Sequence, residues 1–139
     1  MKAERKPTRG ERNFNPGNIR RTSAPWKGKV IGLDNEFETF DCAENGIRAL
    51  GKILLTYQRK YGLYTVGQII SRWAPPAEND TISYVHAVAR EMGVEHDARL
   101  DPESNETLQR LVRAIIHHEN GRVIYVDAQI IEGVERALA

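Results

Sequence analysis

The chain has 139 residues, of which 40% are hydrophobic and 28% are charged, and its formal net charge is +1. This size and composition fit one domain with a buried core and exclude a largely disordered chain. The single cysteine, Cys42, excludes an internal disulfide and a cysteine-rich zinc site. No apolar run reaches the roughly 18 residues of a membrane span, so none is expected.

The start of the chain is strongly basic. Nine lysines and arginines precede Val30, against two glutamates. Such a segment is typical of a solvated tail, and also of an arm that binds nucleic acid or an anionic wall polymer. We interpret residues 1–12 as a flexible basic arm and residues 13–139 as a single domain. The arm lacks the apolar centre of a secretory signal, so no signal peptide is expected.

The irregular front of the domain comes before its first long helix. Residues 13–20 contain the turn sequence FNPGN, and residues 30–40 alternate loosely, which indicates a short strand or extended loop. A capping box at Asp41 and Glu44 then predicts a helix that ends at Gly62.

Two shorter helices are expected next. Thr65 and Gln68 form a second capping box, and that helix ends before Pro75. Asn79 or Asp80 caps the following helix, which ends at the next glycine.

Two last helices complete the pattern. Asp101, with Pro102 just inside the start, opens a helix with an apolar stripe that runs to Ile116. Asp127 caps the final helix. The fold class is therefore mainly α (α+β at most), with a small irregular or hairpin lobe.

The segment AIIHHENG, residues 114–121, carries the strongest chemical signal, and it has three interpretations: a metal cluster, an ordinary helix end or an acid. Adjacent helical residues point about 100° apart, so His117, His118 and Glu119 do not converge on one ion. No metal or other cofactor is expected. A carboxylate at a helix C-terminus faces the negative end of the helix dipole, which favours its protonated form.

Glu119 is therefore predicted to act as the general acid in glycosidic bond cleavage. Sugar sites combine aromatic faces with amide and charged side chains. The loops supply these substrate-binding candidates: Asn15, Asn18, Arg20, Trp26, Trp73, Glu78, Asn79 and Tyr84. The competing interpretation is that Trp73 and Tyr84 belong to the core and that the asparagines are caps.

Three blocks carry a resemblance to a known family. They are RNFNPGNIR (residues 12–20, followed by Trp26), RWAPPAENDTISYVHAV (residues 72–88) and AIIHHENG. With GIRAL after Phe40, they span nearly all of the chain after the arm. The chain resembles small phage and prophage virion proteins with a lysozyme-like, transglycosylase-type domain.

The order of the blocks suggests a circular permutation. In soluble lytic transglycosylases, the helix that ends on the catalytic Glu comes first and a helix marked Tyr-Val-x-x-Val comes later. Here Tyr84, Val85 and Val88 resemble the closing pattern, yet the Glu-bearing helix follows them. WAPPAEN replaces the family's Tyr-Asn-Ala-Gly loop, so both Trp73 and Tyr84 are candidates for the residue that supports the acid.

The resemblance implies a peptidoglycan-cleaving glycosidase, a lytic transglycosylase or muramidase, that cuts between N-acetylmuramic acid and N-acetylglucosamine. Glu119 would protonate the glycosidic oxygen and, in a transglycosylase, then take the proton of the muramyl C6 hydroxyl. A hydrolase would use a second carboxylate. The candidates are Asp34, Glu36, Glu38 and Glu78.

Two other functions stay open. One is a noncatalytic virion protein that binds cell wall or other virion proteins. The other is a nucleic-acid binder that uses the basic arm and Trp26, although no helix rich in Arg or Lys indicates specific readout. We expect a protein of the virion, or of the host cytoplasm before release, that acts on peptidoglycan in the periplasm.

Overall fold

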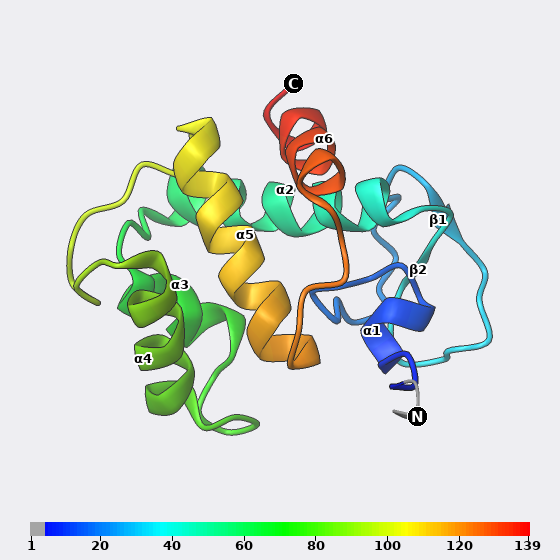
Figure 1. Cartoon of the computed structure of the whole chain (residues 1–139), viewed down its shortest axis with the longest axis horizontal. Coiled ribbons are helices and arrows are strands. Elements are labelled where there is room, and N and C mark those ends of the chain that lie inside the picture. The colour runs from blue at the N-terminus through cyan, green and yellow to red at the C-terminus, as the bar shows by residue number, and fades with distance from the viewer. Residues whose placement is uncertain (1–4) are drawn as a thin grey trace.

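The computed structural model describes residues 5–139 and is mainly helical, as predicted (Figure 1). Short strands, β1 and β2, pair in antiparallel register, with Lys29 opposite Phe40 and Val30 opposite Thr39. The elements in chain order are α1 (Arg9–Arg12), β1 (Lys29–Val30), β2 (Thr39–Phe40), α2 (Ala43–Tyr61), α3 (Val66–Trp73), α4 (Thr81–Met92), α5 (Asn105–Asn120) and α6 (Asp127–Leu138).

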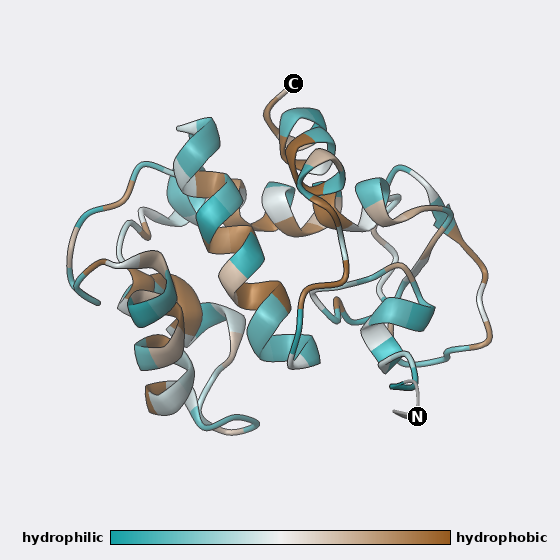
Figure 2. Ribbon diagram, in the orientation of Figure 1, coloured by the Kyte–Doolittle hydropathy of each residue, from teal (hydrophilic) through white to brown (hydrophobic). Residues whose placement is uncertain are grey.

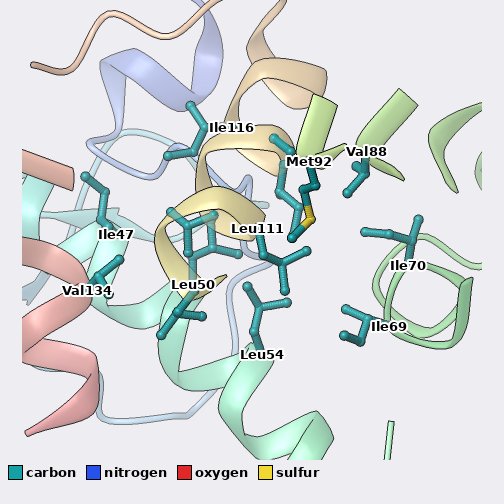
Figure 3. Close-up of a cluster of buried hydrophobic side chains, with 14 of the residues drawn as sticks. Ile47, Leu50, Leu54, Ile69, Ile70, Val88, Met92, Leu111, Ile116 and Val134 are labelled. Atoms are coloured by element: carbon teal, nitrogen blue, oxygen red, sulfur yellow. The ribbon is translucent and has the colours of Figure 1, made fainter. Parts of the chain in front are cut away.

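The core forms where α2, α5 and α6 meet and extends to α3 and α4. In Figure 1, α5 lies between the α3–α4 pair and the lobe that contains α1 and the strands. Apolar and polar residues alternate along α5 (Figure 2), as expected of a helix that buries one face. Figure 3 shows side chains from these helices interlocking, among them Ile47, Leu50, Leu54, Ile69, Ile70, Val88, Met92, Leu111, Ile116 and Val134.

Several predicted helix ends are confirmed. The Thr65 and Gln68 side chains form the reciprocal capping box of α3, and the Asp80 carboxylate accepts a hydrogen bond from the Ser83 backbone N–H at the start of α4. Gly62 and Gly121 end α2 and α5 in the left-handed conformation, which glycine adopts without steric cost.

Three predicted helix starts were wrong by one to a few residues. The N-cap of α2 is Cys42, because the Asp41 carboxylate accepts a hydrogen bond from the Asn45 side chain instead of capping the backbone. Ser104 caps α5, because Asp101 belongs to a preceding turn.

The third error is at α6. Its N-cap is Val126, whose N–H donates to the Gln129 side chain. Asp127 is the first residue inside the helix, where its carboxylate pairs with Arg113 at 2.8 Å.

Residues 9–12 of the predicted basic arm form α1, and residues 1–4 of that arm lie outside the described residues. Thr8 and Glu11 form a capping box that starts α1, a sequence signal that the prediction missed. Glu11 is buried and accepts two hydrogen bonds from Arg122, at 2.6 and 3.0 Å. This ion pair fixes α1 to the segment that follows α5.

Replacing Glu11 with glutamine is expected to lower the free energy of unfolding at neutral pH by about 2 kcal/mol, because the Arg122 guanidinium loses its charged partner. Hydrogen bonding to Arg122 lowers the pKa of Glu11 from its ordinary value of 4.5. The stabilisation is therefore complete above that value and is lost as the pH falls below it. Urea denaturation over a pH series should show a shallower acid decline for Glu11→Gln than for the wild type. An equal decline in both proteins would contradict this role.

The small lobe has its own apolar cluster next to the main core. Ile19, Phe40 and Ala49 are buried there, and the rings of Trp26 and Trp73 pack against them. This cluster attaches the lobe to α2 through Ala49 and to α3 through Trp73.

Candidate functional site

Glu119 lies in the last turn of α5, half-buried, with both carboxylate oxygens hydrogen-bonded. The Asn18 amide nitrogen donates to Oε1 at 3.0 Å, and the Tyr84 hydroxyl donates to Oε2 at 2.8 Å. The two donors come from segments far apart in the chain, one before the strands and one in α4. They fix the direction of the carboxylate, while each oxygen keeps a further lone pair for a ligand.

Tyr84 is the buried support of this carboxylate. Its ring is 2% exposed and stacks on the His118 ring, with centroids 3.7 Å apart. Burial, together with the charge of Glu119, raises the pKa of Tyr84, so the hydroxyl stays protonated and donates. The Trp73 indole N–H donates to the Tyr84 oxygen at 3.2 Å. Of the two residues predicted as candidates for supporting Glu119, Tyr84 makes the direct contact, and Trp73 donates a hydrogen bond to Tyr84.

Asn18 is presented by a tightly bonded turn. Asn18 has a φ of 52°, in the left-handed region that asparagine tolerates better than most residues. The side chain of Asn15 holds this turn together, because it donates to the carbonyls of Ile19 and Glu38 and accepts from the Ile19 N–H. Asn120 joins the turn to α5 by donating to the Pro16 carbonyl at 2.8 Å.

A groove of about 460 Å³ opens in front of Glu119. The turn that carries Asn18 forms one part of its wall, and the loop after Trp73 forms another. An ion pair of 3.7 Å between Arg20 and Glu78 joins these two segments. The lining residues are Gly17, Asn18, Ile19, Arg20, Thr22, Phe37, Ile53, Tyr57, Trp73, Ala74, Glu78, Asn79 and Glu119.

The structure brings most of the predicted site residues together. Asn18, Arg20, Trp73, Glu78 and Asn79 line the groove with Glu119. Tyr84 does not line this groove and instead donates a hydrogen bond to Glu119.

Besides Tyr84, two other predicted substrate-binding residues do not line this groove. Asn15 is 0% exposed, and its amide is hydrogen-bonded to the backbone of Ile19 and Glu38. Trp26 packs against the small apolar cluster and lines a separate pocket.

Only one of the four candidate second carboxylates lines the groove, and it is Glu78. Asp34 is held by Arg9 and Asn13, and hydrogen bonding to Arg9 keeps the pKa of Asp34 well below its usual range. Glu36 is exposed and lies 3.6 Å from the same arginine. Glu38 is buried and pairs with Lys29 at 3.0 Å.

The sequence prediction missed several groove residues. Phe37 lies beneath the guanidinium groups of Arg9 and Arg20, at 4.4 and 5.3 Å from its ring centroid. Tyr57, on α2, also lines the groove. No local signal distinguishes a groove tyrosine from a core tyrosine at the same helical spacing.

The two histidines beside Glu119 make different contacts. His117 Nδ1 lies 2.7 Å from a carboxylate oxygen of Glu91, and His118 stacks on Tyr84. Among residues 5–139, no group of three or more His, Cys, Asp or Glu side chains is arranged to hold a metal ion. No helix in that same range is long and apolar enough to cross a membrane.

These features define a mainly helical protein with a half-buried glutamate, held by Asn18 and Tyr84, at the wall of a loop-lined groove. No protein-family model matches the chain. The chain is 42% identical over 131 residues to Protein P5 of Pseudoalteromonas phage PM2, a match that covers 91% of this chain and 80% of that protein. The chain therefore belongs to the same family of phage proteins.

Proposed function

We propose that this protein is a peptidoglycan-cleaving glycosidase with a lysozyme-like domain, in which Glu119 is the general acid. The observation that carries the proposal is the double hydrogen bonding of Glu119, by Asn18 and Tyr84, at the wall of the groove. A carboxyl group fixed in direction and half shielded from water is what protonation of a glycosidic oxygen requires. Trp73 and Tyr57 supply aromatic groups for sugar rings along the same groove.

In this proposal, a glycan strand lies in the groove with the bond between N-acetylmuramic acid and N-acetylglucosamine at Glu119. The carboxyl group protonates the bridging oxygen, that C–O bond breaks, and an oxocarbenium-like centre develops on the muramyl ring. In a lytic transglycosylase, the Glu119 carboxylate then accepts the proton of the muramyl C6 hydroxyl, whose oxygen closes the anhydro ring. In a muramidase, water attacks instead, and Glu78 is the carboxylate available to assist.

The order of the elements supports a circular permutation of the lysozyme-like domain. The helix that carries the acid, α5, follows α2 and the α3–α4 pair in the chain and packs against α2 and α4. The groove is closed by the turn at residues 13–20. The segments that surround the proposed acid thus come from both ends of the chain.

The decisive experiment is product analysis. Purified protein and its Glu119→Gln form are incubated with peptidoglycan, and the released muropeptides are identified by mass spectrometry. Release of anhydromuramyl products by the wild type alone indicates a lytic transglycosylase, and release of reducing ends alone indicates a muramidase. If neither protein releases muropeptides but both bind the wall, the chain is a noncatalytic wall-binding protein and the enzyme proposal fails.

Tyr84→Phe is expected to lower kcat by about tenfold to a hundredfold, because the hydrogen bond that directs the Glu119 carboxylate is lost. KM should stay nearly constant, since the buried Tyr84 does not face the groove. Rates of muropeptide release measured over a range of substrate concentrations separate the two constants. A change in KM alone would assign Tyr84 to substrate binding and contradict the positioning role.

The family relationship to a phage protein fits a role at the bacterial wall. We propose that the protein is made in the host cytoplasm, is associated with the virion through other virion proteins, and acts on peptidoglycan in the periplasm. Detection of the chain in purified particles by mass spectrometry tests the association with the virion.

A further inference from the structure

A second pocket, of about 340 Å³, lies beside the small apolar cluster and is lined by three positively charged side chains. It is lined by Ala24, Pro25, Trp26, Lys27, Arg48 and Lys52, and we refer to it as the Trp26 pocket. Trp26 is half-buried and packs its ring against the cluster of Ile19, Phe40 and Ala49. The three cations come from two segments, the loop after Trp26 and one face of α2.

None of these three cations has an acidic partner within residues 5–139. Lys29, the neighbouring lysine of the loop, is instead paired with Glu38. The two acids at the start of α2 are engaged elsewhere, since Asp41 binds Asn45 and Glu44 accepts from Gln129. Three unpaired cations around one pocket are suited to bind an anionic group.

The Trp26 pocket and the groove at Glu119 are neighbours on α2. Arg48 and Lys52 line the pocket, whereas Ile53 and Tyr57 line the groove. Trp26, Ile53 and Trp73 pack against the same buried cluster, so this cluster separates the two depressions. Both depressions thus border the same stretch of α2, residues 48–57.

We propose that the Trp26 pocket binds the carboxylates of the peptide stems that branch from the glycan strand. This inference rests on the proposed function, because it takes the glycan to lie in the groove. Peptidoglycan stems project from the muramyl residues and carry free carboxylates, which match the charge of Lys27, Arg48 and Lys52. The proposed protein would then recognise stem-bearing glycan better than bare glycan.

The test is a binding experiment in the Glu119→Gln background, which does not depend on cleavage. Arg48→Gln with Lys52→Gln is compared with a control pair of the same charge change, Lys60→Gln with Arg90→Gln, on the exposed surfaces of α2 and α4. Each protein is titrated against intact sacculi and against sacculi stripped of stem peptides by an amidase. We expect the pocket variant to bind intact sacculi about tenfold more weakly than the control and to bind stripped glycan equally well.

Other results overturn the inference. Equal binding of both variants to intact sacculi means that the pocket is not used. An equal loss on stripped glycan means that the cations contact the sugar backbone rather than the stems. If the pair is needed for binding an oligonucleotide but not for binding sacculi, the pocket is a nucleic-acid site. Failure of the glycosidase proposal is recognised separately, by the absence of muropeptide release from the wild type.

Discussion

Replacing Glu119 with glutamine is expected to lower the rate of muropeptide release by about a thousandfold, because the variant cannot donate the proton that the leaving oxygen needs. Glutamine keeps the shape of the side chain, and its oxygen can still accept the hydrogen bond from Asn18. Its amide nitrogen then faces the Tyr84 hydroxyl, which loses its acceptor. The free energy of unfolding should therefore fall by only about 1 kcal/mol.

A control for this measurement is available on the same helix. Glu106→Gln changes the same functional group at the other end of α5, where Glu106 is exposed and pairs with Arg110. Both variants are assayed for muropeptide release and for unfolding in urea. If Glu119→Gln kept the rate of the Glu106→Gln control, Glu119 would not be the acid, and the groove would have to act through another residue.

The sequence predicted the helices well where local chemistry decides their limits. The glycines at positions 62 and 121 and the capping box at Thr65 act within a few residues of themselves, and the structure confirms them. Prediction failed where a side chain had a competing partner. Asp41 binds Asn45 rather than the start of α2, and this preference depends on how the loop turns before the helix.

The candidate site was predicted in part for the same reason. Glu119 was found from the local pattern of its helix, but its contact with Asn18 joins residues 101 positions apart. Asn15 and Asn18 belong to the same NPGN turn and have the same chemistry. The Asn15 amide bonds the backbone of Ile19 and Glu38, whereas the Asn18 amide donates to Glu119, and only the folded backbone separates these roles.

Trp26 shows the converse case. An aromatic residue in a polar loop fits a sugar site, and nothing in its neighbourhood in the sequence assigns it to one depression or another. The structure places it beside Arg48 and Lys52 because α2 brings those cations under the loop. Contacts between loops and helices that are distant in the sequence thus determine which pocket a candidate residue lines.

Gly46→Ala is expected to lower the free energy of unfolding by about 3 kcal/mol or more, the largest stability effect of any single methyl addition proposed for this chain. A Cβ at this position in α2 would overlap the carbonyl oxygen of Phe14 and would lie 2.9 Å from its carbonyl carbon and 3.1 Å from Pro16 Cδ. These are backbone and ring atoms that cannot rotate away. Alanine's better helix propensity offsets only about 1 kcal/mol of the cost.

The same substitution should also impair the site, because the displaced turn carries Asn18. Asn15 ties Phe14 and Pro16 to the rest of the turn, so a shift at Gly46 moves Asn18 away from Glu119. Gly67→Ala is the matched control, since its new Cβ would approach no atom more closely than the His96 carbonyl oxygen, at an ordinary 3.4 Å. Urea denaturation of both variants should show a large loss for Gly46→Ala and little change or a slight gain for Gly67→Ala. Equal stabilities would mean that the turn moves away from α2 without an energetic cost. The turn would then not hold Asn18 rigidly, as the proposed mechanism requires.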